Sequence, residues 1–282
     1  MNTENIPSNS PSPEISLKTL WGASRWPGSA RSSVVVQRQS GDQTLRRLRQ
    51  MLAVHTCGLL YGPHGVGKSF LIHCLTRSLS PKEYRVIRLT HSSLMGGDLM
   101  RQLLNQAGKT PLFRRGDNVR QLQNLWEEWH PIWPVLIIEE AQDLNAPALE
   151  ELRLLTCART DTQNPFSLIL IGDPQLPPRL EMGVNRALLS RMGFSLKLEP
   201  RDKPSLTHYL DQRFQEVGIH TCPLEPPAQE LLLQSAKGIP RTLNSLLQRA
   251  MELAAEKQCA QITIQDVQSA LDTMPWVAGS CS

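Results

Sequence analysis

The stretch of sequence that decides the fold is GPHGVGKS, from Gly62 to Ser69, which fits the pattern G-x-x-x-x-G-K-[ST]. It follows a short apolar run, Cys57–Tyr61, and precedes a segment with helical periodicity, Ser69–Leu79. Glycines in such a loop let the backbone curl so that several N–H groups point at one anion. A helix that begins at the end of the loop adds the positive partial charge of its N-terminus. The stretch therefore predicts a phosphate-binding loop between a strand and a helix.

The side chains of this loop predict ATP and Mg²⁺ as the ligands. We expect Lys68 to reach the β and γ phosphates and the Ser69 hydroxyl to ligate the magnesium ion. The residues expected to bind the nucleotide are Gly62, Pro63, His64, Gly65, Val66, Gly67, Lys68, Ser69 and Phe70.

A second motif, Val135–Glu140, consists of four apolar residues followed by two carboxylates. A buried strand that ends in acids places them beside the phosphates, at the edge where open α/β sheets bind ligands. We expect Glu139 to hold Mg²⁺ through water and Glu140 to polarise the attacking water. Glu139 stands where aspartate is usual and is one methylene longer. Two interpretations follow: a slow or partner-stimulated ATPase, or a scaffold in which ATP stabilises an assembly.

Short apolar runs alternate with helical segments up to Pro200, and the rest of the chain is helical. This order predicts an α/β fold in which a parallel sheet is covered by helices, followed by a small helical lid domain. The expected strands are Cys57–Tyr61, Tyr84–Leu89, Val135–Ile138, Leu168–Ile171 and Phe194–Leu198. The expected helices after Pro200 are Lys203–Val217, Pro227–Ala236, Pro240–Glu256 and Ile264–Asp272. The expected domains are a flexible N-terminal tail or arm (1–32), the nucleotide-binding domain (33–200), the lid (201–275) and a tail (276–282).

The N-terminal segment begins with a polar stretch, residues 1–13, whose composition predicts disorder. Two tryptophans flank turn residues in Leu20–Gly28, which favours a segment pinned to the domain surface over a partner-binding arm. Ser33–Val36 is expected to be extended, and leucines spaced three and four apart predict an amphipathic helix over Gln43–Leu52.

Composition limits the class of protein. A net charge of +4 and a pI near 8.8 permit a nucleic-acid partner without requiring one. The N-terminus lacks the basic-then-apolar pattern expected of a signal peptide, and no apolar run reaches the ~18 residues that a membrane helix needs. We therefore expect a cytoplasmic protein that does not contact a membrane. The cysteines are scattered and predict reduced thiols without structural zinc; they are Cys57, Cys74, Cys157, Cys222, Cys259 and Cys281.

Further motifs extend the pattern: Ala141–Leu144, Leu170–Leu176, Ser190–Arg191 and Gly238–Arg241. Together with the first two motifs they resemble those of AAA+ ATPases, from about residue 33 to residue 273. The resemblance is to the ExeA-like group, which includes transposon ATPases of the TnsC, TniB and MuB kind. It implies a homo-oligomer that depends on ATP and binds each nucleotide between neighbouring subunits.

The resemblance also implies roles for three further residues. Asp173 occupies the sensor-1 region, where the family usually has asparagine or glutamine. Arg191 matches the arginine finger that reaches a neighbour's γ-phosphate, with Arg186 as a substitute, and Arg241 matches sensor 2. The alternative for Arg191 and Arg241 is a surface arginine in a weak salt bridge.

Basic residues are concentrated between Arg101 and Arg120, where the only acid is Asp117. The part GKTPLFRRGD is expected to be a loop, and in similar ATPases this face lines the DNA channel. Sequence-independent phosphate contacts are expected from Lys109, Arg114 and Arg115, although a solvated loop explains the same charges.

Three functions remain open. The first is a transposition regulator that assembles on double-stranded DNA as a ring or filament, near the nucleoid, and recruits a transposase with a target-selection protein. The second is an ExeA-type secretion ATPase, for which we expect a membrane span and a periplasmic domain. The third is a replication initiator or loader, for which we expect an appended DNA-binding domain. The short chain without these additions favours the first.

Overall fold

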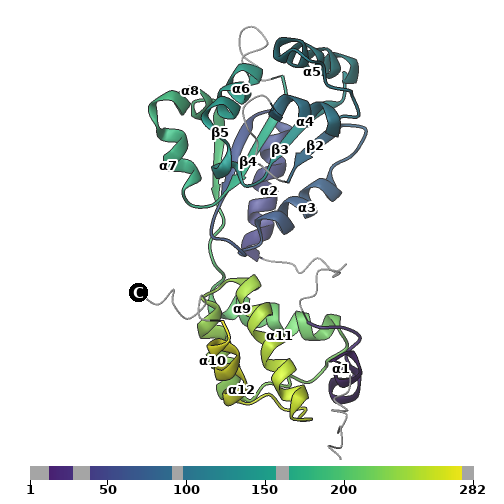
Figure 1. The fold of residues 1–282 in the computed structure, drawn as a ribbon, viewed down its shortest axis with the longest axis vertical. Coiled ribbons are helices and arrows are strands. Elements are labelled where there is room, and N and C mark those ends of the chain that lie inside the picture. The colour runs from purple at the N-terminus through teal and green to yellow at the C-terminus, as the bar shows by residue number, and fades with distance from the viewer. Residues whose placement is uncertain (1–12, 28–38, 91–97, 157–164, 275–282) are drawn as a thin grey trace, which may run out of the picture. The chain divides into compact units, whose positions relative to one another are not determined.

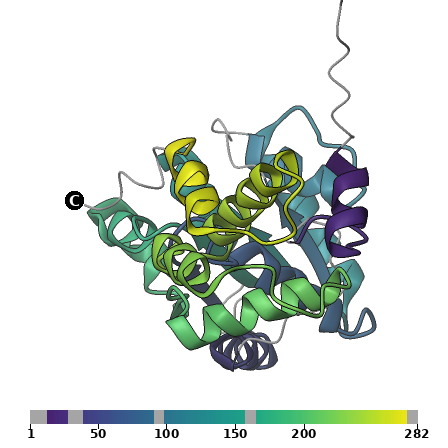
Figure 2. The same cartoon turned by 90° about the horizontal axis from the view of Figure 1, so that it is seen from below.

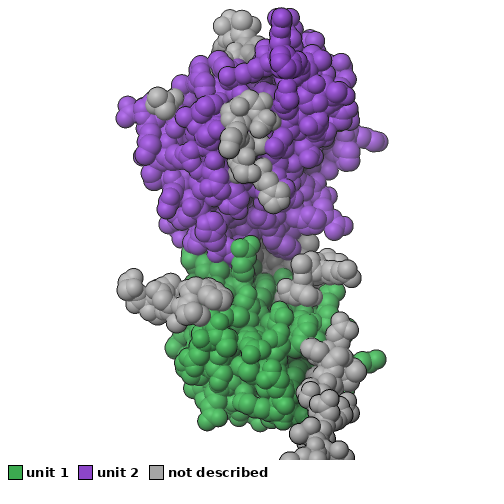
Figure 3. All heavy atoms as spheres, viewed as in Figure 1, with its two compact units in different colours: residues 1–36, 200–282 green, residues 37–199 purple. Residues whose placement is uncertain are grey.

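The computed structural model describes residues 13–27, 39–90, 98–156 and 165–274 (Figure 1). The chain divides into two compact units, one of residues 37–199 and one of residues 1–36 and 200–282 (Figure 3). Some expectations fall outside the described residues: the polar tail before Pro13, the extended run Ser33–Val36, the C-terminal tail, and two cysteines, Cys157 and Cys281.

The larger unit is built on a parallel sheet of order β2-β3-β4-β1-β5. The predicted α/β fold class is therefore confirmed, with each strand within two residues of its expected bounds. The strands are β1 (Cys57–Tyr61), β2 (Tyr84–Leu89), β3 (Trp133–Ile138), β4 (Ser167–Gly172) and β5 (Met192–Lys197).

Helices cover both faces of this sheet because its central strands are apolar on both sides. On one face, Leu136 and Ile138 of β3 join a core formed with α4, α5, α6, α7 and α8. On the other, α2 lies so close to β1 that a Cβ on Gly58 would come within 2.5 Å of the Met51 sulfur. The helices are α2 (Gln39–Ala53), α3 (Lys68–Ser78), α4 (Asp98–Gln106), α5 (Arg115–Trp129), α6 (Ala146–Thr156), α7 (Leu176–Glu181) and α8 (Arg186–Leu189), with 3-10 turns η1 (Ala141–Asp143) and η2 (Gly183–Asn185).

The smaller unit is helical, as predicted for the chain after Pro200. Its helices, which Figure 2 shows from below, pack around their own core of buried leucines and alanines. The chain reverses between α10 and α11 at Gly238, where φ is +77° and a Cβ would collide with the backbone of Arg201. The helices are α9 (Lys203–Glu216), α10 (Pro226–Ala236), α11 (Pro240–Glu256) and α12 (Ile264–Asp272).

The expectation of a flexible arm over residues 1–32 does not hold for its described part, residues 13–27. Helix α1 (Pro13–Trp21) packs in the helical unit, where Leu17 is 2% exposed. The Trp21 indole donates to the Ala260 carbonyl at 2.6 Å, and Trp26 packs against the same core. The physical reason is apolar burial. These contacts bear out the surface-pinned interpretation of the two tryptophans.

None of the helices in the described part of the chain combines the length and the apolar character that a membrane span requires.

Candidate nucleotide-binding site

The phosphate-binding loop follows β1 and leads into α3. Gly65 and Gly67 have φ values of +78° and +110°, the left-handed region that favours glycine. Gly62 has no room for a side chain, because a Cβ there would collide with the Leu198 carbonyl. Phe70, in the first turn of α3, is 38% exposed. The loop thus has the tight backbone that the motif predicts.

Lys68 is buried, with 7% of its surface exposed, and its ammonium contacts backbone carbonyls at the start of the loop. Nζ donates to the carbonyls of Gly62 at 2.6 Å and Pro63 at 3.1 Å. These contacts hold the ammonium over the loop. Phosphate oxygens can replace the carbonyls as its acceptors, so its position fits an anion in the loop.

Ser69 and Glu139 meet where a magnesium ion is expected. The Ser69 hydroxyl donates to Oε2 of Glu139 at 2.6 Å. Hydroxyl and carboxylate oxygens are the ligands that Mg²⁺ prefers. The pair therefore fits a divalent cation held beside the phosphates.

Arg88 also contacts Glu139, which the sequence analysis missed. Its Nε and Nη2 lie 2.7 and 2.5 Å from Oε1 of Glu139. Arg88 is on β2, opposite Ile137 of β3 in the strand register. The available signal was an arginine near the end of an apolar run, YRVIRL, whose partner strand could not be known from spacing alone.

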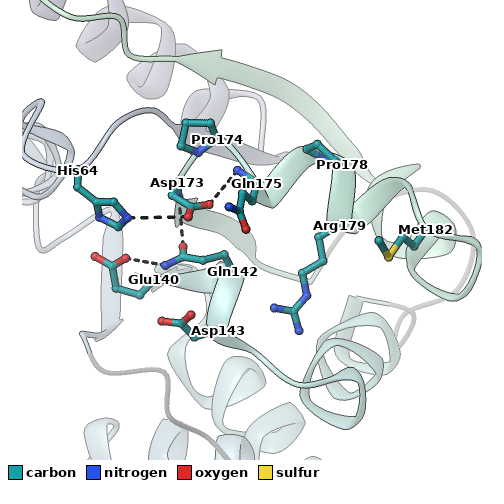
Figure 4. Close-up of a pocket in the computed structure, with 10 residues that line it drawn as sticks. All are labelled: His64, Glu140, Gln142, Asp143, Asp173, Pro174, Gln175, Pro178, Arg179 and Met182. Atoms are coloured by element: carbon teal, nitrogen blue, oxygen red, sulfur yellow. Dashed lines mark hydrogen bonds and ion pairs between the residues drawn. The ribbon is translucent and has the colours of Figure 1, made fainter. Parts of the chain in front are cut away.

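Glu140 follows in the left-handed conformation, with φ +50° and ψ +42°. Such backbone in a non-glycine residue is costly and is concentrated at functional sites. Oε2 of Glu140 accepts from the Gln142 amide at 2.8 Å, and Oε1 of Gln142 accepts from the Asp173 backbone N–H at 3.2 Å. Gln142, not singled out from the sequence, thus joins the predicted water-activating carboxylate to the end of β4 (Figure 4).

The Asp173 carboxylate contacts both its own turn and the phosphate-binding loop. Oδ1 accepts from the Gln175 backbone N–H at 2.8 Å, and Oδ2 lies 3.8 Å from Nε2 of His64. His64 reaches across from the phosphate-binding loop (Figure 4). These side chains line an open cavity of about 870 Å³, whose lining residues are His64, Glu140, Gln142, Asp143, Asp173, Pro174, Gln175, Pro178, Arg179 and Met182. The ends of β1, β3 and β4 meet here because neighbouring parallel strands share a carboxyl edge.

Arg191 lies at the opposite edge of the sheet, just before β5. Nη1 donates to the carbonyl of Thr156, the last residue of α6, at 3.2 Å. Burial raises the pKa of Cys57, the first residue of β1, to about 11, and the nearby charge of Arg191 partly opposes this. Arg191 therefore lies near the amino ends of β1 and β5, whereas the phosphate-binding loop follows the carboxyl end of β1. Its role as an arginine finger stays a prediction. Arg186 is exposed and its Nε donates to the Glu181 carbonyl at 3.3 Å.

Arg241, the second residue of α11, is exposed on the helical unit. Its contact with phosphate stays a prediction.

The basic segment is partly helical, contrary to the expected loop, because α5 begins at Arg115. Nε of Arg115 lies 2.9 Å from Oε1 of Glu151, whose side chain is fully buried. Lys109 pairs with Glu128 at 3.0 Å, whereas Arg114 is exposed at the N-cap of α5. Of the three predicted DNA contacts, Arg115 thus has a structural role within the unit.

Comparisons with known proteins agree with this geometry. A family model described as "AAA domain" matches residues 34–180. The chain is 30% identical, over 219 residues, to general secretion pathway protein A of Aeromonas hydrophila. That alignment covers 74% of this chain and 39% of the relative, so the chain spans about two fifths of the relative's length.

Solved structures share the fold. The chain superposes on the Drosophila ORC bound to DNA with a TM-score of 0.67 and 18% identity, covering 98% of this chain and 69% of that one. The chain superposes on Aeropyrum pernix ORC1 in complex with DNA with a TM-score of 0.63 and 20% identity, covering 86% of this chain and 66% of that one. On the Thermotoga maritima RuvB Holliday junction branch migration motor it superposes with a TM-score of 0.56 and 20% identity, covering 84% of this chain and 69% of that one.

Proposed function

The chain belongs to the AAA domain family of ATPases, and we propose that it binds ATP with Mg²⁺ and hydrolyses ATP to ADP and phosphate. The observation that carries this proposal is the hydrogen bond of 2.6 Å between Ser69 and Glu139 beside the buried Lys68. It joins the two halves of a nucleotide site that lie 70 residues apart in the chain.

In this proposal the loop amides and Lys68 bind the β and γ phosphates, and Ser69 and Glu139 hold the ion. An ion held by Ser69 and Glu139 would supply positive charge that offsets the negative charge developing on the phosphate oxygens. Glu140 orients a water molecule for attack on the γ-phosphorus and accepts its proton, while the bond to the ADP oxygen breaks. Gln142 holds the Glu140 carboxylate in position.

Arg191 supplies the final charge from a second copy. A cation in trans stabilises the transferred phosphoryl group and couples hydrolysis to assembly. The position of Arg191 away from its own loop supports a homo-oligomer with shared sites.

We further propose that the assembly forms on double-stranded DNA and regulates transposition by recruiting a transposase together with a target-selection protein. The exposed Arg114, with exposed Arg101 on α4 and exposed Arg120 on α5, supports the DNA contact, because cations bind phosphates irrespective of sequence. Two proteins with the same fold are described as bound to DNA. This proposal implies a cytoplasmic, nucleoid-associated protein.

A secretion role is the second candidate, favoured by the 30% identity to general secretion pathway protein A. The response of assembly and hydrolysis to added DNA distinguishes the two candidate functions. An ATPase that acts on DNA should assemble and hydrolyse faster with a random duplex, whereas an export ATPase should ignore it. An initiator or loader would also respond to DNA but would bind one sequence in preference to others.

The test of the ATPase is phosphate release with and without duplex, compared across three proteins. Lys68→Ala should lose nucleotide binding. Glu140→Gln should keep binding and lower the rate by about 10²- to 10⁴-fold, the usual contribution of a general base. Equal rates in Glu140→Gln and the unaltered chain would refute the catalytic assignment, and ATP binding without turnover in the unaltered chain would favour the scaffold interpretation.

A further inference from the structure

The loop between α4 and α5 presents an apolar tip to solvent. Phe113 is 94% exposed, more than any other large hydrophobic side chain in the described residues, and its neighbour Leu112 is 47% exposed. Exposed aromatic surface of this size is unfavourable at about 25 cal/mol per Å². An aromatic that none of the described residues of its unit covers points to a contact outside the chain.

The exposure is imposed by the loop backbone. Asn118, on α5, is only 1% exposed, and its side-chain amide bonds both backbone groups of Leu112. Oδ1 accepts from the Leu112 N–H at 2.6 Å, and Nδ2 donates to the Leu112 carbonyl at 3.1 Å. Gln121 holds the same loop through the Thr110 carbonyl at 3.3 Å. The tip is therefore preorganised, which lowers the entropy lost on binding.

The charges around the tip select the kind of partner. Arg114, in the loop, and Arg101, on α4, are exposed, and Nη2 of Arg101 lies 3.5 Å from the Phe113 carbonyl. Arg120, on α5, is also exposed. Of the acids near the loop, Glu128 and Glu151 are paired with Lys109 and Arg115, and Asp117 lies in the first turn of α5. An apolar tip within a cationic surface fits a polyanion that also offers flat apolar surfaces, which is the chemistry of a nucleic acid.

We propose that Phe113 is the residue through which this loop contacts DNA bases. Its ring stacks on a base or wedges into a base step, with Leu112 beside it, while Arg114 contacts the adjacent phosphate. A wedge partly unstacks the duplex, so binding is tighter where stacking is already weak. The inference rests on the DNA-binding part of the proposed function and gives the loop a second mode of contact beyond charge.

The experiment measures binding of the full chain, with a non-hydrolysable ATP analogue, to a labelled random duplex and to the same duplex with a central mismatch. Salt is varied for each DNA. Phe113→Ala should weaken binding about tenfold, within the range for one base–aromatic contact. It should leave the salt dependence unchanged and abolish the preference for the mismatch. Phe113→Trp, which keeps a flat apolar ring, should retain both the affinity and the preference.

Two further variants serve as controls. Arg114→Ala should reduce the slope of log affinity against log salt by about one, because one phosphate contact is lost. Val54→Ala alters another exposed apolar side chain of the same unit, 63% exposed at the end of α2, and should change nothing.

The outcomes separate the inference from the function beneath it. If the unaltered chain binds DNA and Phe113→Ala binds both duplexes equally well, the inference is wrong and the DNA-binding proposal stands. If the unaltered chain binds neither duplex, both are wrong. If Phe113→Ala keeps its DNA affinity and loses oligomers in sedimentation, the tip is a contact between subunits and the inference is overturned.

Discussion

Arg88 and Glu139 form the contact that distinguishes the proposed magnesium site from the expected pattern. Glutamate in place of aspartate extends the side chain by one methylene and gives the carboxylate more accessible rotamers. The arginine holds Oε1 at 2.5 to 2.7 Å and leaves Oε2 facing the Ser69 hydroxyl. At the scale of single residues, the longer acid is thus oriented from the neighbouring strand, and in the proposed site Arg88 would act on the ion through Glu139.

We predict that Arg88→Met lowers ATP hydrolysis and raises the Mg²⁺ concentration needed for half-maximal nucleotide binding. Outer partners of metal ligands typically contribute 10- to 100-fold to metal affinity or activity. Fluorescent nucleotide binding over a magnesium series measures the second effect independently of turnover. The matched control is Arg85→Met on the same strand, whose guanidinium lies 4.7 Å from the Trp129 ring. Equal magnesium dependence in the two variants would remove the orienting role from Arg88.

At the scale of elements, the start of each helix determines which side chains are available for function. Helix α5 begins at Arg115, so this arginine faces the buried Glu151, while Arg114 remains at the exposed N-cap. Helix α12 begins with a reciprocal capping box in which Thr263 and Asp266 bond each other's backbone N–H groups. Nζ of Lys257 adds an ion pair to Asp266 at 2.5 Å.

We predict that Asp266→Asn destabilises the helical unit by about 1 to 2 kcal/mol, the scale of a lost helix cap. Burial acts to raise the pKa of Asp266, but hydrogen bonds from Lys257 and Thr263 outweigh it and the pKa is lowered from 3.8. The carboxylate therefore stabilises the fold above about pH 4, and that contribution is lost as the pH falls through the folded-state pKa.

Thermal unfolding at pH 7 and at lower pH checks this prediction. The difference between the unaltered chain and Asp266→Asn should shrink as the pH falls below 4. Asp272→Asn, at the exposed end of the same helix, is the control and should show little change. A difference that stays constant with pH would assign the lost stability to packing instead of charge.

At the scale of the whole molecule, the proposed catalysis would require more than one copy. The carboxyl edge of the sheet holds the loop, Glu139 and Glu140, and the amino edge holds Arg191 beside Thr156. A head-to-tail contact between copies would bring the two edges together, as in heterologous interfaces that form rings or filaments.

We predict that Arg191→Ala lowers hydrolysis by about 10³-fold, as for other arginine fingers. A mixture of Arg191→Ala with Lys68→Ala should recover activity, because the second variant can lend its arginine to the intact loop of the first. Phosphate release from the mixture, against each variant alone, measures the recovery. A mixture no more active than its components would place the function of Arg191 within one chain.

The local features of this protein follow from sequence because their physical causes are local. Glycine spacing predicted the phosphate-binding loop, and an apolar run ending in two acids predicted the acid pair. Apolar runs that alternate with helical segments predicted the parallel sheet covered by helices. Only the folded chain revealed the partners of those residues. Arg88 meets Glu139 across 51 positions and Gln142 meets Asp173 across 31, because strand order and register set these pairs and spacing along the chain does not. Tertiary packing likewise brings α1 to the helical unit, where Trp21 donates to the Ala260 carbonyl 239 residues away. It also decides that Arg115 is paired with Glu151 while Phe113 is exposed.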